Sequence, residues 1–195
     1  MKTKAITQAN DRLRRAKAAL ARVASASSFE DLSEAWSDFL LLSNGVYFKL
    51  ALGAVGCGKS EAWRGRKRRE RKVDELLQYL HQARNSDEHG IEPVAEMKGK
   101  LSISGFGYLR GLVAIPLEDG SAKIALDADP EVEVSFSTYA ALVPVTNSEH
   151  GDTFQVPTCH LGHALVNPTP QRAGKLFVSY LERLIAEAAE LPQRG

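Results

Sequence analysis

The chain of 195 residues is long enough for one sizeable hydrophobic core and a small second one. Its net charge of +1 gives no overall attraction to a polyanion, so any nucleic-acid site must come from local clustering. Two distant cysteines exclude a disulfide framework, and no apolar run approaches the ~20 residues of a membrane helix. The charged N-terminal stretch is unlike a secretory signal. We therefore expect a cytoplasmic protein with reduced thiols and no membrane partner.

Apolar residues at helical spacing predict three helices in the first half of the chain. The first is expected over residues 4–24. The second begins after an N-cap at Ser27 or Ser28 and reaches about Leu52. The third is expected as one continuous helix over residues 61–85, which is strongly basic in its first half and rich in leucine in its second.

The second half of the chain changes character. Short alternating or β-branched runs predict three to five antiparallel strands over residues 100–157, and Asp119-Gly120 suits a hairpin turn. Thr169 as N-cap and Pro170 in the first turn predict a last helix. Its apolar face is broad and one-sided, so we expect this helix to pack back on the earlier ones.

These elements predict an α+β protein that is mainly helical. About four helices form a bundle, and an antiparallel β segment lies between the third helix and the last. The expected organisation is a helical region over residues 1–97, the β segment over 98–160, and a C-terminal helix over 161–195 that completes the bundle.

Residues 53–60, GAVGCGKS, match the nucleotide-binding P-loop pattern letter for letter. That site requires a buried strand before the loop and a helix after it. Here the apolar spacing before the loop is helical, and no later apolar strand ends in an aspartate that could bind magnesium. The sequence therefore predicts a glycine-rich connection between two helices and no ATP or GTP hydrolysis. Phosphate binding by its backbone N–H groups is the alternative.

A second motif carries more specific chemistry. Arg84 falls on the leucine-rich face of the third helix, where a guanidinium is costly unless it is paired or serves a ligand. Asn85 follows it, and Asp87 and Gly90 indicate a bend that would bring His89 back toward the arginine. An arginine can bind a phosphodiester with two hydrogen bonds, a histidine can move a proton, and an asparagine can orient either. Together they predict attack of an RNA 2′-hydroxyl on its own phosphate, with no metal or cofactor.

The run Arg84-Asn85-Ser86-Asp87-Glu88-His89 resembles the signature of the HEPN superfamily, and the helical pattern over residues 4–92 is compatible with it. The resemblance implies a small helical bundle that forms a homodimer with two motifs facing one cleft. It also implies a metal-independent endoribonuclease, often a toxin of a toxin–antitoxin system or a phage-defence effector. Other members only bind RNA or protein. A purely structural Arg84, paired with an acid, and a helix-capping His89 remain the alternative.

Two further groups of residues were considered. Cys159, His160 and His163 are spaced within reach of one metal ion, but we interpret them as polar loop residues and expect no metal site. The β segment could bind a protein partner. Basic residues crowd the first half of the third helix, where they would bind RNA phosphates or form a solvated surface. They are Arg64, Arg66, Lys67, Arg68, Arg69, Arg71 and Lys72.

Overall fold

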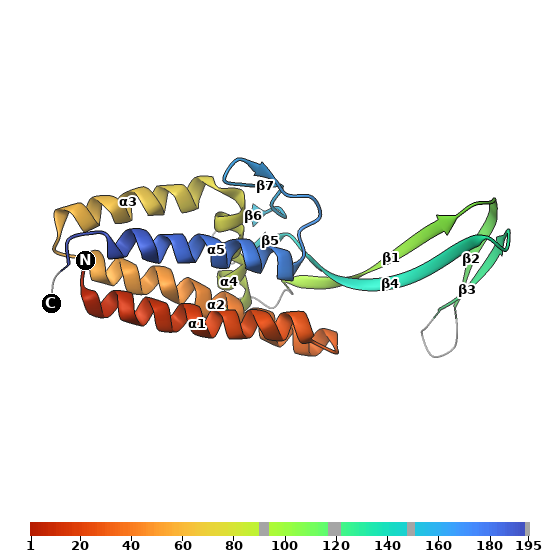
Figure 1. The fold of residues 1–195 in the computed structure, drawn as a ribbon, viewed down its shortest axis with the longest axis horizontal. Helices are drawn as coiled ribbons and strands as arrows, with labels where there is room; N and C mark the ends of the chain where they lie inside the picture. Colours follow the sequence, from red (N-terminus) through yellow and green to blue (C-terminus); the bar gives the residue numbers. More distant parts are fainter. Residues whose placement is uncertain (90–93, 117–121, 148–150, 194–195) are drawn as a thin grey trace. The chain divides into compact units, whose positions relative to one another are not determined.

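The computed structural model describes residues 1–89, 94–116, 122–147 and 151–193. They divide into a helical unit, residues 1–97 and 140–195, and a β unit, residues 98–139. The fold is α+β and mainly helical, as predicted (Figure 1). The described helices are α1 (Thr3–Ser25), α2 (Phe29–Ala54), α3 (Gly58–Val73), α4 (Glu75–His89) and α5 (Pro170–Ala189). The strands are β1 (Ala95–Gly105), β2 (Leu109–Pro116), β3 (Ala122–Ala128), β4 (Val132–Leu142), β5 (Val145–Thr146), β6 (Thr153–Phe154), β7 (Cys159–His160) and β8 (His163–Ala164).

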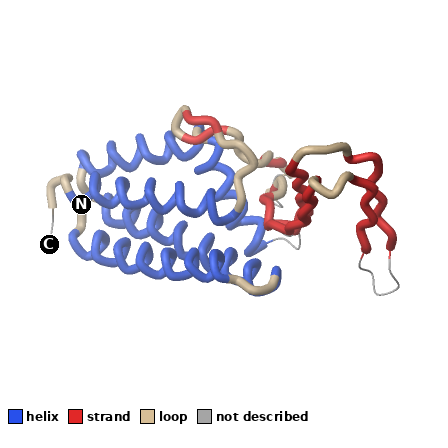
Figure 2. The backbone as a smooth tube through the Cα atoms, turned by 45° about the vertical axis from the view of Figure 1, so that its right-hand side comes forward, coloured by secondary structure: helices blue, strands red, loops and turns tan. Residues whose placement is uncertain are grey.

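The helical unit is built around the bulky stripe of α2. Trp36 and Phe39 are fully buried and stack with their ring centroids 5.2 Å apart. The Ser28 hydroxyl accepts a hydrogen bond from the backbone N–H of Asp31, so the predicted cap starts this helix. In Figure 2, α1, α2, α3 and α5 run side by side. The core between the helices is formed mainly by α1, α2, α4 and α5, and Trp63 is the residue that α3 adds to it.

The last helix packs back on the others, as predicted. The ring of Phe177 on α5 meets Phe39 edge-on and stacks near Tyr47, both on α2. Gly174 approaches α1 so closely that a Cβ there would come 2.4 Å from a Leu20 methyl carbon. The chain also begins α5 as expected, with the Thr169 hydroxyl accepting from a backbone N–H of the first turn.

The prediction of one continuous third helix is wrong. The chain forms α3 and α4, which are separated at Asp74, where the backbone leaves the helical conformation. In Figure 1, α3 lies along the bundle, and after the break α4 leaves that direction and crosses behind α5. The leucine-rich half and the basic half of the predicted helix therefore point along different axes.

The P-loop string adopts the helix–helix connection predicted for it. Residues before it belong to α2 and those after it to α3, so no strand precedes the loop. The backbone N–H of Gly56, at a φ of 82°, donates to the Glu61 carboxylate over 2.8 Å. Ser60, which would bind magnesium in a P-loop, is fully buried. A carboxylate thus occupies one N–H group that a phosphate would need.

The β unit is a pair of two-stranded ribbons. β1 neighbours β4, and β2 pairs antiparallel with β3, with Gly111 opposite Asp127. The expected turn at Asp119-Gly120 lies outside the described residues. The predicted β segment ran to residue 160, but residues 140–160 belong to the helical unit. There, β5–β6 and β7–β8 form two short hairpins. No helix in the described part of the chain is both long and apolar enough to cross a membrane.

Candidate functional site: a cationic pocket in the helical unit

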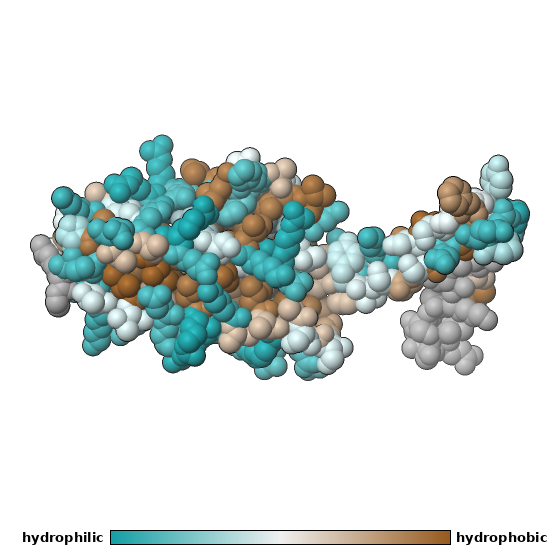
Figure 3. Space-filling model, in the orientation of Figure 1, coloured by the Kyte–Doolittle hydropathy of each residue, from teal (hydrophilic) through white to brown (hydrophobic). Residues whose placement is uncertain are grey.

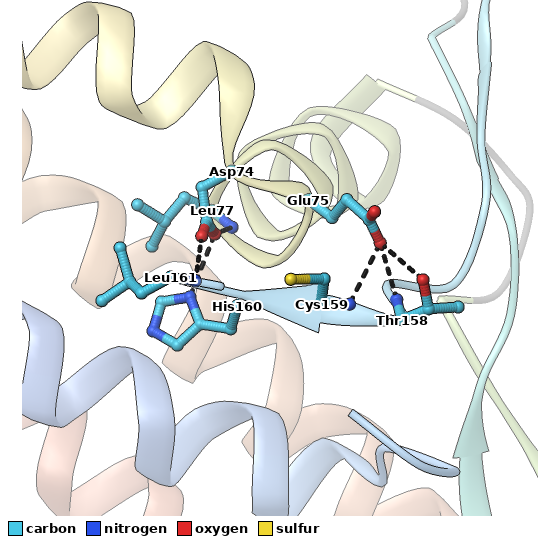
Figure 4. Close-up of polar contacts among 7 residues, drawn as sticks. All are labelled: Asp74, Glu75, Leu77, Thr158, Cys159, His160 and Leu161. Carbon is cyan, nitrogen blue, oxygen red and sulfur yellow. Dashed lines mark hydrogen bonds and ion pairs between the residues drawn. The ribbon is translucent and has the colours of Figure 1, made fainter. Parts of the chain in front are cut away.

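The break between α3 and α4 is held by a buried carboxylate. Asp74 accepts the backbone N–H of Leu77 over 2.9 Å and so caps α4. The same carboxylate binds His160 Nδ1 at 3.0 Å and the Leu161 N–H at 2.7 Å, both from the β7–β8 hairpin (Figure 4). Burial raises the pKa of Asp74, but the hydrogen bonds from His160, Leu161 and Leu77 outweigh it, so the pKa lies below its usual value.

The neighbouring Glu75 fastens the same hairpin. One of its carboxylate oxygens accepts from the Thr158 N–H, the Thr158 hydroxyl and the Cys159 N–H. These hydrogen bonds lower the pKa of Glu75. His160 is therefore a structural partner of Asp74. No group of three metal-ligating side chains comes together among the described residues.

One face of α3 is turned toward a pocket. Arg64, Lys67, Arg68 and Arg71 are three or four residues apart and share that face. Lys67 is fixed by Glu70 at 2.9 Å and by Glu187 of α5 at 2.8 Å, and Glu187 also accepts from the Trp63 indole N–H. These contacts anchor α3 to α5 and fix the direction of its arginine face.

The pocket has a volume of about 900 Å³, which is within the range of small-ligand sites. Its lining comes from all five helices and is strongly basic. Among the described lining residues there are seven cations and one carboxylate, that of Glu61. The cations are Arg12, Lys49, Arg64, Lys67, Arg68, Arg71 and Arg84. Lys67 is paired with Glu70 and Glu187, and the remaining cations give the pocket a local positive charge that attracts anions and that the net charge of the chain does not show.

Arg84 lies at this pocket and not in the apolar core. Its side chain is half-buried, and its guanidinium donates to the Asn85 side-chain oxygen over 3.3 Å. Arg84 lies one turn after Leu80 and two turns after Leu77 on the leucine-rich face of α4, as predicted, and both leucines are fully buried. This face reaches the pocket at Arg84, so the prediction that the core encloses the guanidinium is wrong. α4 continues through Asp87 without the expected bend, while Gly90 lies outside the described residues.

The rest of the predicted catalytic trio is only partly placed. Asn85 is half-buried, and its amide donates to the Gln82 side-chain oxygen over 3.4 Å. His89 is the last residue of α4, and its side chain lies outside the described residues. The structure thus brings Arg84 and Asn85 into contact and leaves the His89 position a prediction.

Arg71 joins the pocket to the aromatic core. Its guanidinium carbon lies 4.9 Å from the centre of the Tyr47 ring, in cation–π contact. Burial raises the pKa of Tyr47, with the neighbouring Tyr180 adding to the effect, so the hydroxyl stays neutral. The cation is thus held over a neutral ring, and its position is set by packing.

His81 also lines the pocket and carried no functional signal in the sequence. Its Nδ1 lies 3.2 Å from the Asn44 side-chain oxygen. Burial, together with the positive charges of Arg71 and Arg84, lowers the pKa of His81 to about 4. The imidazole is therefore neutral near pH 7, and in the tautomer that donates to Asn44 its Nε2 is a hydrogen-bond acceptor.

The basic run on α3 divides into two sets. Arg64, Lys67, Arg68 and Arg71 line the pocket, whereas Arg66, Arg69 and Lys72 lie on other faces of α3 and do not line it. The sequence grouped all seven as RNA-binding. It missed the pocket residues that come from α1 and α2, which are Arg12, Asn44, Phe48 and Lys49.

Comparisons with known proteins identify no relative of this chain. No family model matches the chain, and neither the curated proteins nor the solved structures contain a significant match. The pocket must therefore be read from its own chemistry. It offers several arginines to an anionic group, a neutral hydrogen-bonding histidine and an exposed aromatic ring.

Proposed function

We propose that the protein binds RNA in the cationic pocket and cleaves it without a metal ion. The observation that carries the proposal is the convergence on one pocket of Arg84 from α4 and the arginine face of α3. These side chains come from two helices whose angle is fixed by Asp74 and the β7–β8 hairpin. Arginines are the side chains best suited to bind phosphodiester oxygens with paired hydrogen bonds.

The cleavage step is supported by the resemblance of residues 84–89 to the HEPN motif. In this proposal, Arg84 binds the phosphodiester and stabilises the charge that develops on its oxygens. His89 takes the proton of the 2′-hydroxyl as the oxygen attacks phosphorus and the bond to the 5′-oxygen breaks, and the 5′-oxygen takes a proton from water and leaves as a 5′-hydroxyl. Asn85, which already contacts Arg84, holds the guanidinium in position. The resemblance also supports a homodimer in which two such sites face one another.

Incubation of the purified protein with RNA in the presence of EDTA tests this proposal. We expect products that end in a 2′,3′-cyclic phosphate and a 5′-hydroxyl. Arg84→Ala and His89→Ala should each abolish cutting while the thermal midpoint stays near that of the wild type. Arg84→Lys should also fail, because a point charge cannot replace the two-pronged guanidinium. Cutting that persists in these variants would contradict the roles of Arg84 and His89.

Binding of RNA without cleavage is the second candidate. It is favoured by His81, the histidine that lines the pocket among the described residues. The pKa of His81 is about 4, so its imidazole is neutral near pH 7. Such a group provides a hydrogen bond and no ready proton. Binding that depends on Arg84, together with intact RNA after long incubation, would select this candidate over cleavage.

A further inference from the structure

We infer that Phe48 on α2 forms a base-stacking subsite in the cationic pocket. The RNA enters as a single strand, and one of its bases leaves the neighbouring bases and stacks on the Phe48 ring. The inference rests on the proposed RNA binding and adds the part of the ligand that the arginines do not explain. The resemblance of residues 84–89 to the HEPN motif implies no role for this surface of α2.

Phe48 is an exposed aromatic residue inside a charged site. Its relative exposure is 62%, whereas Trp36 and Phe39 of the same helix are fully buried in the core. Leu41, seven residues earlier on the same face, is 46% exposed and lines the same pocket. An apolar floor beside arginines fits a ligand that carries both a flat apolar group and negative charge.

A cation lies close to this ring. Gly45 is three residues before Phe48 on the same face of α2, and a Cβ at Gly45 would lie 3.4 Å from Arg12 Cδ and 3.7 Å from Arg12 Nε. The Arg12 side chain therefore lies over Gly45, one turn from the ring. Lys49, the next residue along α2, also lines the pocket. A base on Phe48 would have its own phosphate within reach of these two cations.

The cations on the opposite wall form a row. Arg64 and Arg68 lie one turn apart on α3, which is about 6 Å along the helix axis. A linear row of cations matches the linear row of phosphates in a nucleic-acid strand. A base must leave its stack to reach Phe48, and stacking of a base on an aromatic ring contributes ~1–3 kcal/mol. These features together favour a single strand over a duplex, and over an isolated phosphate.

The test compares two oligonucleotides that differ only in their bases. Both carry 2′-O-methyl groups, so attack by a 2′-hydroxyl cannot cut them, and one has abasic sites in place of several bases. Fluorescence anisotropy should show that the wild-type protein binds the base-containing strand roughly tenfold more tightly than the abasic one. In Phe48→Ala this preference should disappear, while the salt dependence of binding stays unchanged because the phosphate contacts remain.

Two variants control for packing and chemistry. Phe48→Trp should restore the preference, because an indole also stacks on bases. Leu52→Ala removes another exposed apolar residue of α2, 50% exposed, that does not line the pocket, and the preference should persist. A preference that survives in Phe48→Ala, or is lost in Leu52→Ala, overturns the inference.

The remaining outcomes separate this inference from the proposed function. Equal binding of the two strands by the wild-type protein overturns the base subsite and leaves RNA binding in place. Failure to bind either strand contradicts both. Vesicles of phosphatidylglycerol provide the last comparison. If they displace the base-containing strand and Phe48→Ala weakens vesicle binding, the ring is a lipid contact and the inference is wrong.

Discussion

The helical unit and the β unit of this protein use similar apolar residues in opposite ways. In the helical unit, Trp36 and Phe39 are 0% exposed and lie in one continuous core. In the β unit, Phe106 is 91% and Tyr108 78% exposed, and hydrophobic side chains are visible on its surface in Figure 3. The stability of the chain therefore resides in the helical unit, which also provides the walls of the pocket.

The largest expected effect comes from removing a core ring. Phe39→Ala should lower the free energy of unfolding by ~3–5 kcal/mol, because it leaves a cavity among Trp36, Phe177 and their neighbours. Phe106→Ala removes the same ring from an exposed position and should change stability by less than ~0.5 kcal/mol. Urea denaturation of both variants measures the difference. Similar losses in the two variants would break the contrast between the units.

The next effect concerns the junction that orients α3 and α4. Asp74→Ala removes the cap of α4 and leaves the His160 and Leu161 donors without their acceptor, so we expect a loss of ~3 kcal/mol. Thr158→Val removes only the exposed hydroxyl that Glu75 accepts and should cost less than ~1 kcal/mol. If Asp74→Ala melts at the wild-type temperature, the angle between α3 and α4 has another origin.

Asp74 also gives the helical unit a pH dependence. Its pKa is lowered in the folded protein, so its stabilising contribution is complete above the unfolded value and is lost as the pH falls through the lower folded value. The stability difference between the wild type and Asp74→Asn should thus be constant above about pH 5 and shrink below about pH 4. Denaturation at a series of pH values measures it. A difference that grows toward acid pH would show that the sign is wrong.

Exposed ion pairs should contribute little to the stability of either unit, so we expect the smallest difference between the units here. Lys17 and Glu182 join α1 to α5 at 2.5 Å, and Arg110 and Asp127 join β2 to β3 at 3.4 Å, with all four side chains about half exposed or more. Double-mutant cycles should give coupling energies below ~1 kcal/mol for both pairs. A strong coupling in the β pair alone would show that charge, and not apolar burial, holds that unit together.

The sequence was sufficient where local signals decide the structure. Ser28 and Thr169 cap their helices as predicted, because a side-chain hydroxyl at this position accepts a hydrogen bond from a backbone N–H of the first turn that has no partner within the helix. The break at Asp74 was missed, although an aspartate followed by Glu75 is a typical helix start. The apolar spacing continues across it, and its partners His160 and Leu161 lie more than eighty residues away.

The candidate site was predictable in part for the same reason. Arg84 and the arginines of α3 are conspicuous as local motifs, and the pocket contains several of them. Phe48 and His81 have ordinary surroundings in the sequence and become pocket residues only through the packing of α2, α3 and α4. The spacing of Arg64, Arg68 and Arg71 places them on one face of α3, but the prediction grouped them with the other basic residues of the run. Only the structure shows which face meets α2.

RNA binding by two charge-matched variants is the most direct measurement of the central claim, which is that the pocket, and not the basic run as a whole, binds RNA. Arg64→Ala/Arg68→Ala removes two cations that line the pocket, whereas Arg66→Ala/Arg69→Ala removes two cations of other faces of α3 that do not line it, and all four side chains are exposed. We predict that the first pair weakens binding of a 2′-O-methyl oligonucleotide and lowers the salt slope by about two, and that the second pair leaves both near wild type. Equal losses in the two variants would show that RNA follows the charge of α3 in general, and would contradict the assignment of the pocket.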